Sequence, residues 1–242
     1  THAIGIIVPS IIDSFYSALV TTMEQLAEEH GYLTVLQFSH NSPRRERRAL
    51  SRLISMDVAG IALAPLGNSS DVNAILDARN RVPLVIVDSR LKPGLPYVGT
   101  NNWQSVSLMV DYLCRSGPPP ALFTMPPINM NVVERREAYC AKMKSLGHLP
   151  NILNPDDGTI GDDYEQYGYE RFLTLGNDRL KGVSSILCPN DRVAFGIIAA
   201  AAKLGVPVGK TTGDMFRVAG HDGQHFGRYT NPPLTTVAQD VR

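Results

Sequence analysis

The sequence has few cysteines, no excess of either charge and no long apolar run, and each shortage argues against a class of protein. The 242 residues include three cysteines, far apart and outside any CxxC pair, which suits a reducing compartment and gives no disulfide framework. Lys plus Arg and Asp plus Glu each total 23, which argues against a broad basic surface that holds a polyanion. No run approaches the roughly 20 apolar residues of a membrane helix, and no signal peptide precedes the first apolar segment.

The motifs of common catalytic sites are missing as well. There is no GxSxG nucleophile elbow, no GxxxxGK phosphate loop and no GxGxxG after a strand. His221 and His225 are four residues apart, but their segment has loop character and no third ligand in register, so no metal site is predicted. Five arginines within residues 44–52 are interpreted as the solvated face of a helix. We therefore expect no enzymatic activity, no cofactor and no metal.

Short apolar, β-branched runs alternate regularly with segments of helical periodicity. Ile4–Val8 and Val82–Val87 are nearly continuous apolar runs, which is typical of strands buried on both faces. The segment Asp13–His30 carries apolar residues at helical spacing, with Asp13 or Ser14 as a natural N-cap. Successive β-α units with short links predict parallel sheets wrapped by right-handed crossovers.

Two such series follow each other along the chain, which is longer than one typical domain of about 100–150 residues. The break falls near Thr100–Trp103. We predict an α/β fold with an N-terminal lobe over residues 1–101 and a C-terminal lobe over residues 102–238. Residues 239–242 are expected to begin a return crossover to the N-terminal lobe, and Val208–Met215 to form a surface loop.

Polar side chains follow several of the predicted strands. They are Asp13, Asp88, Asn190, Asp191, Asp222 and Gln239. Open α/β sheets bind ligands at the carboxyl ends of their strands. Carboxylates accept hydrogen bonds from hydroxyl groups, and amides can both donate and accept them. The sequence therefore predicts one cleft that binds a polyhydroxylated molecule.

Six segments carry a family resemblance through their order and spacing. They are IGIIVPS with DSFYSALVTTMEQLAEEHGY, RRERRALSRLISMDVAGIALAP, VPLVIVDSRL, RREAY, CPNDRVAFG and HDGQHFGRYTNPPLTTVAQD. In these segments the chain resembles the effector-binding core of lactose-repressor/galactose-repressor-type (LacI/GalR-type) transcription regulators, which share their fold with periplasmic sugar-binding proteins. The resemblance spans nearly all of the chain. It implies two similar Rossmann-like lobes of the periplasmic-binding-protein-like type I fold, with a hinged cleft between them.

In the first lobe the resemblance assigns ligand binding to Asp13, Phe15 and Asp88. An aromatic face stacks on the C–H face of a sugar ring, and carboxylates accept from its hydroxyl groups. The alternative for Asp13 is that it only caps its helix. Phe15 is preferred to Tyr16, because Tyr16 fits the buried stripe of the helix. Asp88 is followed by Ser89, where sugar receptors of the family often have arginine.

In the second lobe Arg135 stands where the family's RLxGY motif places its ligand-binding arginine. The motif is written RREAY here, so its Leu and Gly are replaced while the arginine keeps its place. A guanidinium offers a rigid fork of donors that suits adjacent hydroxyls or a carboxylate. The alternative, a solvated helix arginine, fits Arg136 better. Asp163 or Tyr164 matches the family's aromatic wall, and Tyr164 is preferred.

The resemblance also assigns Asn190, Asp222 and Gln239 to the ligand site. Asn190 can donate and accept at once, as vicinal hydroxyls require, whereas Asp191 is expected mainly to cap the following helix. The alternatives are that Asp222 is a turn residue and that Gln239 is a solvated loop amide.

The function that the resemblance implies is a cytoplasmic sensor of a small, sugar-like effector. The complete protein would carry an N-terminal helix-turn-helix, absent from this chain, which opens at Thr1. That missing part alone would contact operator DNA, the protein would act as a homodimer, and no membrane would be involved. An effector that binds one arrangement of the lobes better would shift the dimer between DNA-competent and incompetent states.

Two other functions stay open from the sequence. A periplasmic sugar-binding receptor of a transport system would share the cleft, but the missing signal peptide, the unpaired cysteines and the PPLTTVAQD ending argue against it. An α/β sugar-processing enzyme could use Asp13, Asp88 and Asp222 as acid and base groups, although no nucleophile elbow, phosphate loop or metal set accompanies them.

Overall fold

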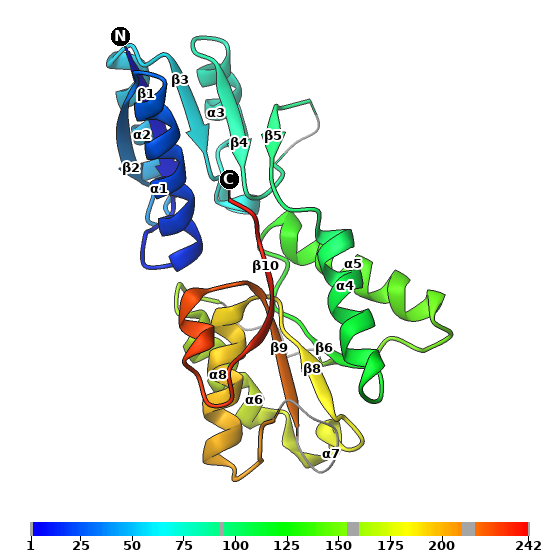
Figure 1. Cartoon of the computed structure of the whole chain (residues 1–242). Coiled ribbons are helices and arrows are strands. Elements are labelled where there is room, and N and C mark those ends of the chain that lie inside the picture. Colours follow the sequence, from blue (N-terminus) through cyan, green and yellow to red (C-terminus); the bar gives the residue numbers. More distant parts are fainter. Residues whose placement is uncertain (1, 92–93, 154–159, 210–215, 242) are drawn as a thin grey trace. The chain divides into compact units, whose positions relative to one another are not determined.

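The computed structural model describes residues 2–91, 94–153, 160–209 and 216–241, so residues 210–215 of the predicted loop lie outside the described residues. The chain divides into two compact units, each built around its own parallel sheet (Figure 1). Unit 1 comprises Thr1–Thr100, Ile128–Asn131 and Asp240–Arg242. Unit 2 comprises Asn101–Pro127 and Val132–Gln239. The predicted α/β fold with two parallel sheets is confirmed.

Unit 1 has a five-stranded sheet with the strand order β2-β1-β3-β4-β5. Its elements are β1 (Ala3–Val8), α1 (Ser14–Glu29), β2 (Leu33–Phe38), α2 (Pro43–Ser55), β3 (Gly60–Leu63), the 3-10 helix η1 (Gly67–Ser69), α3 (Val72–Arg79), β4 (Leu84–Val87) and β5 (Tyr97–Val98). The strands pair in parallel, with Ile6 opposite Leu36 on one side and Ala62 on the other. The two-residue β5 is too short to be recognised from periodicity in the sequence.

Helices cover both faces of the unit 1 sheet, which explains why its strands are apolar at successive positions. On one face α1 packs Leu19, Val20 and Met23 against Ile6, Val8 and Ala62. On the other face α2 and α3 pack Leu50, Leu53 and Ile75 against Ile7, Ile61 and Leu63. Because side chains alternate along a strand, Ile6 and Ile7 of β1 face opposite helix layers.

Unit 2 has a second five-stranded parallel sheet, with the order β10-β9-β8-β6-β7. Its elements are α4 (Asn102–Arg115), β6 (Ala121–Phe123), α5 (Met130–Ser145), β7 (Ile152–Leu153), α6 (Tyr164–Thr174), α7 (Gly176–Leu180), β8 (Ser185–Leu187), α8 (Asp191–Lys203), β9 (Arg217–Asp222), the 3-10 helix η2 (His225–Arg228) and β10 (Thr235–Ala238). In each sheet the second strand along the chain lies on one side of the first, and the later strands lie on the other side. The strand order therefore reverses between β1 and β3 and between β6 and β8. Such switch points are where open α/β sheets bind ligands.

The helices of unit 2 form two layers, with α4 and α5 on one face of the sheet and α6 and α8 on the other (Figure 1). Val110 of α4 and Tyr139 of α5 pack on Leu122, while the next strand residue, Phe123, meets the ring of Tyr167 from α6. Both faces of this sheet are therefore buried as well. In the part of the chain that the structure describes, no helix is long and apolar enough to span a membrane.

Candidate functional site

Asp88 follows β4 in unit 1, and two side chains fix its carboxylate. The hydroxyl group of Tyr16 donates to Oδ2 over 2.9 Å, and the Nδ2 group of Asn131 donates to Oδ1 over 3.0 Å. The backbone φ of Asp88 is +70°, a left-handed conformation that aspartate tolerates better than most residues. The carboxylate is thus held in one orientation at the carboxyl end of the sheet.

Asp13 and Phe15 lie at the start of α1 in the same unit. The Oδ1 atom of Asp13 accepts a hydrogen bond from the backbone N–H of Phe15 over 3.0 Å, so the predicted helix cap is confirmed. The ring of Phe15 stands edge to face with Tyr16, at 5.3 Å between centroids. Tyr16 also lines the buried face of α1, as predicted. Effector contacts of Asp13 and Phe15 stay a prediction.

Arg135 projects from α5 in unit 2, and its guanidinium is held by other groups of that unit. It is 9 % exposed. Its Nε–H donates to Oδ1 of Asn102 over 2.9 Å, and Nη1 donates to the carbonyl oxygen of Pro189. Asn102 is fixed in turn, because its Nδ2 donates to Oε2 of Glu134 over 2.8 Å. The arginine is therefore a positioned cation rather than a solvated one.

Asp222 ends β9 and lies close to Arg135. Its Oδ1 atom accepts from Nε2 of Gln239 over 2.6 Å, and Nη2 of Arg135 lies 3.9 Å from the same oxygen. That separation allows electrostatic attraction but is too long for a direct hydrogen bond. The φ of Asp222 is +131°, which side-chain-bearing residues rarely adopt. The structure thus brings together three of the residues assigned from the sequence.

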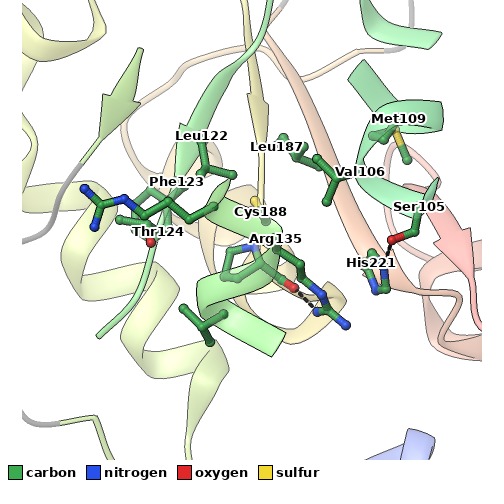
Figure 2. Close-up of a pocket in the computed structure, with 13 residues that line it drawn as sticks. Ser105, Val106, Met109, Leu122, Phe123, Thr124, Arg135, Leu187, Cys188 and His221 are labelled. Carbon is green, nitrogen blue, oxygen red and sulfur yellow. Dashed lines mark hydrogen bonds between the residues drawn. The ribbon is translucent and has the colours of Figure 1, made fainter. Parts of the chain in front are cut away.

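A buried histidine lies beside Asp222. The sequence predicted loop character at His221, but this is wrong, because β9 extends to Asp222 and His221 pairs with Val237 of β10. His221 is 2 % exposed, with Nδ1 at 3.2 Å from Oδ1 of Asp222 and Nε2 at 2.8 Å from Oγ of Ser105. Figure 2 shows His221 and Ser105 joined in this way, beside Arg135. Burial lowers the pKa of His221 well below its ordinary value, and the charge of Arg135 lowers it further. The signal in the sequence that could have identified this contact is a histidine directly before a carboxylate at the end of a predicted strand.

The N-cap of α8 is Asn190, and not Asp191 as expected. The Oδ1 atom of Asn190 accepts from the backbone N–H of Val193 over 2.8 Å, so Asn190 caps α8 and the prediction that Asp191 mainly caps it is wrong. The extended backbone of Asn190 lets its side chain reach the third helical N–H, as an N-cap does. Asp191, already inside the helix, is buried and accepts from Thr236 and from the backbone N–H of Gln224.

Burial shifts the ionisation of both carboxyl groups near the end of β9. Burial and, to a smaller extent, the negative charge of Asp222 raise the pKa of Asp191 to about 7. Burial also raises the pKa of Asp222 to about 6, although the charge of Arg135 and the hydrogen bond from Gln239 oppose this rise. The two groups therefore do not ionise independently near neutral pH.

Tyr164 opens α6, and the residue before it caps that helix. Asp163 accepts from the backbone N–H of Gln166 over 2.8 Å, so its side chain serves the helix terminus. The ring of Tyr164 lies under the guanidinium of Arg192, 4.9 Å from its carbon to the ring centroid. Arg192 makes hydrogen bonds to both carboxylate oxygens of Glu165. The aromatic ring is thus held in place, and its contact with an effector stays a prediction.

A small cavity lies in unit 2, lined by residues of α4, α5 and the sheet (Figure 2). Its volume is about 10 Å³, which is room for about one water molecule and far too little for a sugar ring. Ser105, Arg135 and His221 line it together with Cys188. Within the described ranges no cluster of three or more His, Cys, Asp or Glu residues could hold a metal ion.

Two parallel α/β units with polar side chains at the carboxyl ends of their strands define the periplasmic-binding-protein-like class. Residues 4–228 match the family model described as periplasmic binding protein domain, and the chain belongs to that family.

Proteins similar to the chain include transcriptional regulators. The chain is 25 % identical over 238 residues to the HTH-type transcriptional regulator KdgR of Bacillus subtilis, covering 98 % of this chain and 68 % of that protein. A probable LacI family transcriptional regulator of Corynebacterium glutamicum is 25 % identical, with a TM-score of 0.82 over 98 % of this chain and 88 % of that one. A LacI family regulator of Enterococcus faecium with bound ribose has the same fold, at 22 % identity and a TM-score of 0.79, over 99 % and 84 % of the two chains.

Proposed function

We propose that this chain is the effector-binding core of a LacI-type transcriptional regulator and that its effector is a sugar or a sugar derivative. The observation that carries the proposal is the cluster of Arg135, Asp222 and Gln239, in which a positioned cation and an oriented carboxylate stand at the end of β9. The similarity to HTH-type and LacI family regulators supports the regulatory role. The ribose bound to a protein of the same fold supports the effector class.

In this proposal polar and aromatic side chains from each unit contact the effector. They are Asp13, Phe15, Asp88, Arg135, Tyr164, Asn190, Asp222 and Gln239. The carboxylates accept hydrogen bonds from hydroxyl groups, the guanidinium and amides donate to ring and hydroxyl oxygens, and an aromatic face covers the apolar side of a sugar ring. Such a site binds a molecule without changing it.

The complete regulator in this proposal acts in the cytoplasm as a homodimer. It contacts operator DNA through a helix-turn-helix outside this chain and uses no cofactor. The similarity to an HTH-type transcriptional regulator supports DNA binding by the whole protein. The similarity to transcriptional regulators is also consistent with a chain that has no enzymatic activity.

A thermal-shift screen tests the effector class. The purified chain is heated with pentoses, hexoses, polyols, sugar phosphates and nucleobases, because a ligand that binds only the folded state raises its stability by mass action. We expect the Tm to rise with at least one sugar or sugar derivative. A rise with nucleobases alone contradicts the proposed effector class.

Variants test the site with the same compounds. Arg135→Ala and Asp222→Ala are expected to remove the sugar-induced shift, since each loses a charged group of the cluster. Lys144→Ala is the matched control, because Lys144 is an exposed cation on the same helix and does not line the cavity beside Arg135. Undiminished shifts in both site variants would show that the cluster does not bind the sugar.

A further inference from the structure

His221 and Asp222 are neighbours on β9, yet their side chains meet. Adjacent side chains of a regular strand point to opposite faces. At Asp222 the backbone is irregular, with φ at +131°, and Nδ1 of His221 lies 3.2 Å from Oδ1 of Asp222. The imidazole thus reaches the carboxylate that the proposed function assigns to the effector.

The other ring nitrogen of His221 is also engaged. Its Nε2 lies 2.8 Å from Oγ of Ser105, which comes from α4 on the far side of the ring. His221 and Ser105 are only 2 % and 4 % exposed, so both side chains are shielded from bulk solvent. A buried polar group needs a partner for each of its hydrogen-bonding atoms, and this ring has one for both nitrogens.

These partners determine which nitrogen carries the hydrogen. A neutral imidazole has a single N–H, and an ionised carboxylate can only accept. Nδ1 therefore donates to the Asp222 carboxylate, which leaves Nε2 as an acceptor. The hydroxyl group of Ser105 lies 2.8 Å from Nε2 and 3.1 Å from the carbonyl oxygen of Asn102, so its one hydrogen has two acceptors, of which Nε2 is the nearer. Burial and the charge of Arg135 both oppose a second proton on the ring.

We propose that His221 is a positioning residue for Asp222, held by Ser105 as the neutral Nδ1–H tautomer. Together with Gln239 it donates to Oδ1 and so fixes the direction of the carboxylate. This role rests on the proposed function of Asp222 in binding the effector. The order Ser105, His221, Asp222 resembles a hydrolase relay. However, Ser105 is only 4 % exposed, and the cavity beside it has room for about one water molecule, which is too little for a substrate.

Other charged groups also face this carboxylate and have to be considered in any titration. Arg135 from α5 and Arg192 from α8 favour its ionised form, while Asp191 from α8 is coupled to it by like charge. The test therefore measures the ring and the carboxylate directly instead of relying on overall stability.

The first measurement is the tautomer of His221 in the unmodified chain, from the ¹⁵N–¹H correlations of its imidazole. We expect the Nδ1–H form at about pH 8, where Asp222 is ionised, and no imidazolium signal at about pH 6.5. Half of the imidazole of free histidine is protonated near that pH, so a neutral ring there distinguishes His221 from an exposed histidine. An Nε2–H tautomer at pH 8, or an imidazolium signal at about pH 6.5, overturns the proposal.

The second measurement is the titration of the Asp222 carboxyl carbon by NMR in two variants. His221→Leu removes the donor and is expected to raise the pKa of Asp222 by about one unit, since a hydrogen bond to a charged group is lost. His221→Asn restores an N–H donor near the position of Nδ1 and is expected to bring that pKa back toward the unmodified value. An unchanged titration in His221→Leu contradicts the positioning role.

If His221→Leu does not fold, the tautomer of the unmodified chain and the His221→Asn titration still decide the question. Neither measurement uses an effector. A failed sugar screen therefore leaves this result intact, and a wrong tautomer leaves the proposed sugar site standing.

Discussion

Asp191 and Asp222 occupy surroundings that disfavour a negative charge. Their folded-state pKa values, about 7 and about 6, lie above the ordinary value near 3.8. As the pH rises from about 4 to about 7, the unfolded chain releases protons that the folded chain still holds. The folded state then binds more protons than the unfolded state, so the free energy of unfolding falls as the pH rises. This contribution is fully present below about pH 4 and is lost as the pH passes the folded pKa values.

Asp191→Asn is expected to flatten this pH dependence, because asparagine keeps the shape of the side chain but does not titrate. The free energy of unfolding, measured by urea denaturation between about pH 4 and pH 7, should fall less steeply than in the unmodified chain. The difference over that range should be on the order of 3 kcal/mol. Asp77→Asn, at an exposed position of α3, is the matched control. Parallel curves for the unmodified chain and Asp191→Asn would contradict the assignment.

At the scale of elements, the contact between α6 and α8 depends on two glycines. A Cβ atom at Gly196 of α8 would lie 2.0 Å from the carbonyl oxygen of Glu165 in α6. A Cβ atom at Gly168 of α6 would lie 2.3 Å from the carbonyl oxygen of Val193 in α8. The two helix backbones therefore touch directly, and their N-termini carry Tyr164 and the Asn190 cap.

Gly196→Ala tests this contact, because the sign of the change in the free energy of unfolding shows whether the helices touch. In an open helix the change stabilises by about 1 kcal/mol, because alanine is the better helix former. Here the added methyl group must push α6 and α8 apart, so we expect a loss of roughly 2 kcal/mol in the free energy of unfolding. Gly161→Ala, where nothing lies within 4 Å of the added atom, is the control for urea denaturation. A gain in stability from Gly196→Ala would show that the helices do not touch.

The elements were predictable to the extent that they repeat a pattern. Strands buried on both faces gave continuous apolar runs, and α1 gave a helical stripe that Asp13 caps as expected. The choice between Asn190 and Asp191 as cap was not predictable, because both residue types cap helices well and the backbone conformation decides.

At the scale of the whole molecule, exposed aromatic side chains in η2 and directly after it support the proposed self-association. Phe226 and Tyr229 are 63 % and 69 % exposed, and the ring of Phe226 stands edge to face with Phe195 of α8. Aromatic residues are enriched in the cores of protein interfaces, and a two-fold dimer buries the same patch on both copies. This observation supports the proposed homodimer.

If the proposed homodimer forms through this patch, replacing both Phe226 and Tyr229 with serine is expected to weaken it at least tenfold. Light scattering coupled to size-exclusion chromatography, repeated over a dilution series, measures the change as a rise in the dissociation constant. Leu149→Ser is the control, since Leu149 is 90 % exposed and lies outside the patch. Identical dissociation of the double variant and the unmodified chain would place the interface elsewhere.

Contacts between distant parts of the chain were the least predictable features. Strand-end polarity singled out Asp88, Asp222 and Gln239, but nothing in the sequence pairs Tyr16 with Asp88 or Ser105 with His221. Tyr16 was predicted on the buried stripe of its helix, and it does pack, partly buried, against the core, yet its hydroxyl group also donates to the carboxylate. Periodicity describes which face a side chain takes and leaves its partners undetermined.

Asp88 and Asp222 both hold their carboxylates on backbone conformations, φ +70° and +131°, that glycine adopts more easily. Selection for heat resistance alone would therefore favour glycine at these two positions and would discard the groups proposed to recognise the sugar. A variant selected only for thermal stability would therefore be expected to lose its response to the proposed effector.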